Sequence, residues 1–136
     1  MWLGDKAARS GIPGDSPADL GDVTIGGENP AVTTETEHRE VCTVAPGGYF
    51  WLPETGTEAL IVNCGDGSKV LAGCTVKGEP EGMEPGEVYI KSKGASVLMK
   101  NNGHIIISGN IGITGNISIC GQVDIIGGLT VNGRVI

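Results

Sequence analysis

The residues best suited to chemistry in this chain are its cysteines and histidines, and their spacing does not gather them into a site. A structural zinc ion takes four ligands, mostly thiolates and imidazoles, usually with two of them only a few residues apart. The sequence contains no Cys-x-x-Cys pair and no cluster of cysteines with histidines. We therefore expect free thiols, no bound metal and no cofactor. The residues concerned are Cys42, Cys64, Cys74, Cys120, His38 and His104.

Two further segments invite comparison with ligand-binding loops. Residues 65–68 read Gly-Asp-Gly-Ser, but no helix or basic residue follows as a phosphate loop requires, so we predict a hairpin turn. Residues 49–53, Tyr-Phe-Trp-Leu-Pro, hold three of the five aromatic residues of the chain. They form either a binding patch or, as we favour, barrel core and trimer contact, because aromatic side chains dominate burial. No catalytic residue emerges, and we expect no enzymatic activity.

An internal repeat dominates the last third of the chain. Glycine recurs every six residues, and aliphatic residues stand two and four places after it. Their alternation with small or polar residues predicts short half-buried strands, with a corner at each glycine. The corner glycines are Gly103, Gly109, Gly115, Gly121, Gly127 and Gly133. The aliphatic residues are Ile105, Ile107, Ile111, Ile113, Ile117, Ile119, Val123, Ile125, Leu129 and Val131, and Val135 begins a sixth unit.

Strands this short cannot bury their own apolar face, so the repeat requires partners. A single chain wound as a solenoid needs about three hexads per coil, and the roughly five and a half hexads here make too few coils for stability. Three identical chains around one axis satisfy the pattern, with the odd-numbered aliphatic side chains meeting in the core. We therefore predict a homotrimer in which folding and assembly are one event. Cys120, on the outward parity, would recur three times around this axis.

The whole chain is predicted to be all-β, in three parts. Residues 1–36, rich in glycine and proline, are expected to form an extended N-terminal arm or linker, with a short strand at 22–25. Residues 37–93 are expected to form a small OB-like barrel domain, with strands at 39–44, 57–63, 69–76 and 87–92. Residues 94–136 are expected to form a C-terminal intertwined triple-stranded β-helix, into which residues 95–99 lead.

The net charge of −7 excludes one class of partner. Nucleic-acid binding requires a basic surface, so we expect none. The excess of acids lies in residues 1–103, because the repeat holds one acid, Asp124, and one base, Arg134. The sequence has no continuous apolar run of about 18 residues, so we expect no membrane-spanning helix. The first residues lack the pattern of a secretion signal. We expect a protein that folds in the cytoplasm.

An OB-like domain running into glycine hexads resembles the central spike proteins of contractile tails. These are the baseplate assembly protein V family of phages and related contractile injection systems. The resemblance covers about residues 37–136 and includes the strand that leads into the hexads. It rests on residues 44–53 (VAPGGYFWLP), 56–62 (GTEALIV) and 65–68 (GDGS).

The resemblance implies a homotrimer at the centre of the baseplate of a virion or phage-tail-like particle, assembled in the host cytoplasm. The barrels would meet the tail tube or hub protein, and sheath contraction would drive the rod through the target cell envelope. Some family members bind iron at the apex through a His-x-His motif. Residues 132–134, at the apex here, include no histidine, so that site is not carried over and a separate tip protein is an option.

Two alternative functions have weaker support. A hexapeptide-repeat acyltransferase needs a longer solenoid and a histidine base, and the repeat offers only His104. A trimeric fibre or adhesin that binds a host surface glycan needs a recognition platform. The outward positions of the repeat hold small residues such as Gly112, Ser118 and Thr130. A structural spike is therefore the favoured function.

Overall fold

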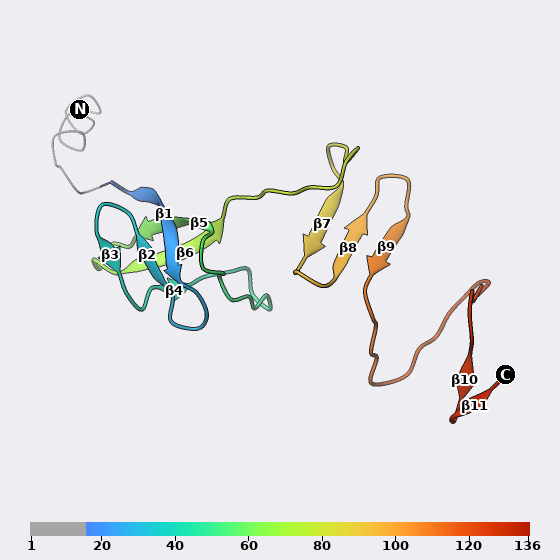
Figure 1. Ribbon diagram of the computed structural model, residues 1–136. Coiled ribbons are helices and arrows are strands. Elements are labelled where there is room, and N and C mark those ends of the chain that lie inside the picture. The colour runs from blue at the N-terminus through green and yellow to red at the C-terminus, as the bar shows by residue number, and fades with distance from the viewer. Residues whose placement is uncertain (1–15) are drawn as a thin grey trace. The chain divides into compact units, whose positions relative to one another are not determined.

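The computed structural model describes residues 16–136, and every regular element in that range is a strand (Figure 1). The all-β class predicted from the sequence is therefore confirmed. No helix within these residues is long and apolar enough to cross a membrane. The chain divides into two compact units, Met1–Pro80 and Glu81–Ile136, which are described one at a time.

The first unit contains one six-stranded sheet. Its strands pair in the order β3-β2-β1-β5-β6-β4, and every pairing is antiparallel except that of β4 with β6. The strands are β1 (Ala18–Ile25), β2 (Ala31–Thr33), β3 (Glu37–His38), β4 (Cys42–Thr43), β5 (Glu58–Asn63) and β6 (Lys69–Cys74).

This sheet must curl, because its two edge strands are almost consecutive in the chain. Six strands laid flat would hold their edges about 24 Å apart, at roughly 4.8 Å for each gap between strands. The chain from His38 in β3 to Cys42 in β4 reaches at most about 14 Å. The sheet is therefore a curled half-barrel. Residues 37–43 lie at both of its edges, with β3 paired to β2 and β4 paired to β6.

The core of the half-barrel is aliphatic. In β5, Ala59 and Ile61 are buried and Leu60 between them is 38% exposed, as the alternation of a half-buried strand requires. The partly buried Trp51 packs against this core. The buried cluster consists of Val23, Val32, Val41, Ala59, Ile61 and Leu71, none of which is more than 4% exposed.

The first strands differ from the sequence-based expectation. The sequence predicts an extended arm over residues 1–36 with one short strand at 22–25. That strand is present as the end of β1, but β1 is longer and lies between β2 and β5 inside the sheet. Gly21 fits this position in the sheet, because a Cβ atom there would lie 2.6 Å from the carbonyl oxygen of Thr33. This glycine permits a close approach of two strands and does not mark a loop. Residues 1–15 of the expected arm lie outside the described residues.

The later strands of the first unit lie close to their predicted positions. β5 and β6 fall within 57–63 and 69–76, and the predicted strand at 39–44 is reduced to β4. The predicted hairpin at 65–68 joins β5 to β6 and is confirmed. Within it, Asp66 Oδ1 accepts hydrogen bonds from Ser68 Oγ (2.6 Å) and Ser68 N (2.9 Å). These two bonds hold the pKa of Asp66 below its ordinary value.

Ile61→Ala should lower the free energy of unfolding by about 2–5 kcal/mol, because it removes a fully buried side chain and leaves a cavity. Leu60→Ala, one residue earlier on the exposed face of β5, is the matched control and should cost less than half as much. Urea denaturation followed by tryptophan fluorescence measures both, since Trp51 packs against the core. Equal losses would contradict the core position of Ile61.

The second unit begins with an antiparallel meander in the order β7-β8-β9 and ends in a hairpin of β10 and β11. β7 and β8 lie within the predicted strand at 87–92 and the predicted bridge at 95–99. Residues 109–129, between β9 and β10, form no strand within the chain. The strands are β7 (Val88–Lys91), β8 (Ser96–Met99), β9 (Ile105–Ser108), β10 (Thr130–Val131) and β11 (Arg134–Val135).

Candidate functional site

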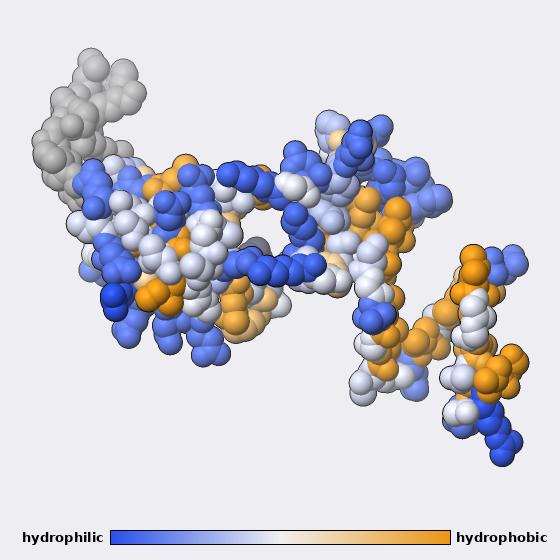
Figure 2. All heavy atoms as spheres, viewed as in Figure 1, coloured by the Kyte–Doolittle hydropathy of each residue, from blue (hydrophilic) through white to orange (hydrophobic). Residues whose placement is uncertain are grey.

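The candidate site is the aliphatic repeat, which a single chain leaves uncovered. Every residue from 101 to 136 is exposed, and Figure 2 shows hydrophobic side chains gathered along the segment after β9. The predicted trimer-axis residues are 40–79% exposed, and full burial of each would contribute roughly 1.5–3 kcal/mol. These residues are Ile105, Ile107, Ile111, Ile113, Ile117, Ile119, Val123, Ile125, Leu129, Val131 and Val135.

Four glycines give the repeat a regular path. Gly109, Gly115, Gly121 and Gly127 have φ values of 134°, 130°, 138° and 124°. A residue with a Cβ atom is strained in this region, whereas glycine is not. A nearly constant φ every six residues repeats the same backbone bend in each unit. The aliphatic pairs are therefore presented at regular steps along the chain.

The two outer glycines of the series lie in hairpin turns. Asn132 and Gly133, with φ values of 50° and 74°, form the two-residue turn between β10 and β11, which is typical of type I′. Gly103, with φ of 90°, lies in the five-residue connection between β8 and β9, where its N–H donates to the Lys100 carbonyl. Val135, at which the sequence predicts the start of a sixth unit, pairs with Thr130 across this hairpin of β10 and β11.

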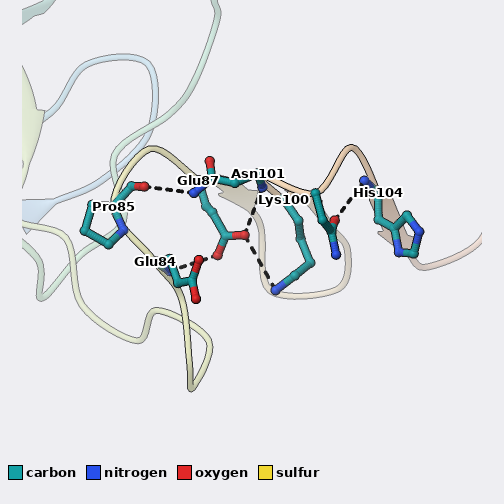
Figure 3. Close-up of polar contacts among 7 residues, drawn as sticks. Glu84, Pro85, Glu87, Lys100, Asn101 and His104 are labelled. Carbon is teal, nitrogen blue, oxygen red and sulfur yellow. Dashed lines mark hydrogen bonds and ion pairs between the residues drawn. The ribbon is translucent and has the colours of Figure 1, made fainter.

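A buried carboxylate holds the turn that leads into the repeat (Figure 3). The Glu87 side chain is 2% exposed and accepts hydrogen bonds from the backbone N–H groups of Glu84 (2.8 Å) and Asn101 (3.0 Å). Lys100 Nζ lies 3.6 Å from the same carboxylate. The Asn101 side chain donates to the Pro85 carbonyl over 2.9 Å. The loop before β7 is thereby tied to the β8–β9 turn, a contact that no pattern in the sequence indicates.

The Glu87 contacts should be sensitive to acid. The hydrogen bond from Glu84, then that from Asn101 and the charge of Lys100, hold the pKa of Glu87 below its ordinary value of about 4.3. A lowered pKa in the folded state stabilises the fold above the ordinary value, and this contribution is lost as the pH falls through the folded value. Glu87→Gln should therefore be less stable at neutral pH and lose less stability on acidification. The measurement is the urea midpoint of each protein over a range of pH. If the midpoint fell equally with pH in both proteins, Glu87 would not have this role.

The chemically capable side chains remain apart. His38 Nε2 lies 3.0 Å from Thr34 Oγ1, and His104 is exposed. Within residues 16–136, no group of three or more His, Cys, Asp or Glu side chains could hold a metal ion. The thiols are free at Cys42, Cys64, Cys74 and Cys120.

The aromatic segment divides between core and surface. Trp51 packs against the aliphatic cluster of the half-barrel. Tyr49 and Phe50 are 67% and 85% exposed in the single chain. The core interpretation therefore applies to Trp51, and the two preceding aromatic side chains lie on the surface of the first unit.

Comparison of the chain with protein-family models, curated proteins and solved structures finds no match in any of the three. The function proposed below therefore rests on the residues of this chain and on the sequence resemblance.

Proposed function

We propose that the chain is the central spike of a contractile tail, a homotrimeric needle that pierces the envelope of a target cell. The observation that carries the proposal is the repeat. It combines uncovered aliphatic side chains with four glycines of nearly equal φ. Three such chains around one axis would bury these side chains in a dry core. Strands paired on both sides would also leave no edge for further growth of the sheet.

The half-barrel supports the second part of the proposal, an OB-like barrel that precedes the needle in the chain. Residues 37–43 pair with β2 at one edge of the sheet and with β6 at the other. If these residues are counted as one bent strand, the half-barrel has five strands. An OB barrel is a five-stranded, partly open barrel of this kind. In the proposed spike, three such barrels form the ring that meets the tail tube or hub protein.

The composition of the repeat suits a part that must pass through an envelope. Apart from Asp124 and Arg134, its outward positions are mainly Asn, Ser, Thr, Gln and Gly, so the outer face carries little charge. A close-packed aliphatic interior has few voids and low compressibility, which favours a stiff rod. The proposed function requires no chemical step, because contraction of the sheath supplies the work.

The mass of the protein in solution tests the proposal. Light scattering of the full chain should give three times the mass of one chain, and negative-stain micrographs should show a thin rod on a wider head. A chain that ends at Ser108 keeps the half-barrel and the meander but loses the rest of the repeat. Its trimer should be much weaker. A full-length monomer, or a trimer unaffected by the truncation, would contradict the proposal.

A further inference from the structure

We propose that the needle interface extends back onto the meander, where one face of β7, β8 and β9 is buried against the same face of two other copies of this chain. The inference rests on the trimer of the proposed function. It adds Val88 and Ile90 of β7 to the trimer core, although neither residue belongs to the hexad series. The meander would then form the wide base of the needle.

Two rows of aliphatic side chains cross this face of the meander. Directly opposed residues of an antiparallel sheet project to the same side, and so do residues two positions apart on one strand. The registers of β7 with β8 and of β8 with β9 therefore place six aliphatic side chains on one face. The first row is Val88, Met99 and Ile105, and the second row is Ile90, Val97 and Ile107. We call this side of the meander the two-row face.

These rows have no adequate cover within one chain. The side chains of Val88, Ile90, Ile105 and Ile107 are 46%, 52%, 64% and 53% exposed. The two residues from the central strand β8 are only partly buried, although they have strands on both sides. A three-stranded sheet gains independent stability from packing its hydrophobic face. The meander therefore needs a partner on this side.

The other face of the meander carries polar groups at both ends. One end carries a row of Lys91, Ser96 and Ser108. The other end carries the ion pair between Glu87 and Lys100. One apolar row lies between these polar groups, compared with two adjacent apolar rows on the opposite face. The sheet is thus amphipathic, and burial of the two-row face removes more apolar surface from water than burial of the opposite face.

Two further copies of the same chain are the partners that fit this face. Ile105 and Ile107 of β9 end the two rows and are also the first aliphatic pair of the hexad series. These two residues therefore belong to both the two-row face and the repeat, so chains that cover the first unit of the repeat reach the meander as well. The two-row face contains no charged side chain, so identical faces meet without like-charge repulsion.

Oxidation of Met99 in the unaltered protein tests the inference. Met99 and Met83 are both partly buried in the single chain. If assembly covers the two-row face, hydrogen peroxide should oxidise Met99 at least about 10-fold more slowly than Met83, as measured by peptide mass spectrometry. Equal rates in a trimeric sample would overturn the inference while leaving the needle intact. Protection of Met99 in a monomeric sample would overturn it too, because the cover would then come from the chain itself.

A pair of aspartate variants separates this inference from the proposed function. Ile90→Asp places a carboxylate on the two-row face, and Ser96→Asp places one on the opposite face of the same sheet. We expect Ile90→Asp to lose the trimer and Ser96→Asp to keep it, with the tryptophan signal of the first unit unchanged in both. A trimeric Ile90→Asp beside a monomeric Ile117→Asp would remove the meander from the interface. If Ile90→Asp and Ile117→Asp both remained trimeric, the needle itself would be rejected.

Discussion

Ile117→Asp should convert the trimer into monomers. In one chain the Ile117 side chain is 63% exposed, and the proposed assembly gathers three copies of it around one axis. The variant would bury three carboxylates together without a counter-charge, at several kcal/mol for each ion, and would lose the burial of three isoleucines. The total, roughly 10 kcal/mol or more, exceeds what a single layer of the core contributes. Light scattering at a fixed protein concentration measures the result.

Ser118→Asp is the matched control for this prediction. Ser118 follows directly in the same unit, and the alternation of the strand directs its side chain to the outer face. The same charge is added to the same segment, so solubility and net charge change equally in the two variants. We expect Ser118→Asp to remain trimeric. If both variants stayed trimeric, or if both became monomeric, the odd-numbered residues would not form the axis.

Local alternation made the central strands of the half-barrel predictable. Ala59 and Ile61 are buried on either side of the more exposed Leu60, and the Gly-Asp-Gly-Ser turn follows within a few residues. The face of a strand and the type of a turn depend on near neighbours in the chain. A single sequence therefore carries enough information to place β5, β6 and the hairpin that joins them.

The first half of β1, its central place in the sheet and the Glu87 contacts escaped prediction because they depend on residues that are distant in the chain. Gly21 indicates a strand only beside Thr33 of the neighbouring strand β2, where a Cβ atom would clash. In the sequence alone it resembles the other glycines of the first 36 residues. The strand at Glu87 was expected, but its carboxylate contacts Asn101, which lies 14 positions later. No periodicity links such a polar pair.

At two positions where the six-residue period predicts corners of the repeat, the structure has hairpin turns. Asn-Gly is the strongest short hairpin signal, and it occurs at both outer glycines of the series, Gly103 and Gly133. The four inner glycines follow Ser, Thr, Cys and Ile. In the structure the outer pair forms turns, and the inner four share the larger φ of the repeat. The Asn-Gly pairs at the two ends of the repeat therefore form turns, and the four glycines between them adopt the repeated bend.

Gly121→Ala should weaken the trimer strongly, although it removes no contact. Gly121 has φ of 138°, a conformation that costs a residue with a Cβ atom about 1–3 kcal/mol. Three chains carry the substitution, so the trimer loses about 3–9 kcal/mol, which raises its dissociation constant by at least about 100-fold. Sedimentation over a dilution series measures the change. A Cβ atom there meets no neighbour within 4 Å in the single chain, so backbone conformation dominates the effect.

Gly112→Ala is the control that isolates this conformational effect. Gly112 lies in the same repeat with its Cβ position equally open, but its φ is outside the positive region. The equivalent positions of the following units carry Ser118, Asp124 and Thr130, so a side chain is already accommodated there. We expect Gly112→Ala to assemble as the parent protein does. Equal weakening by both variants would mean that any added methyl group disturbs the needle. The positive φ shared by the inner glycines would then not be what the trimer requires.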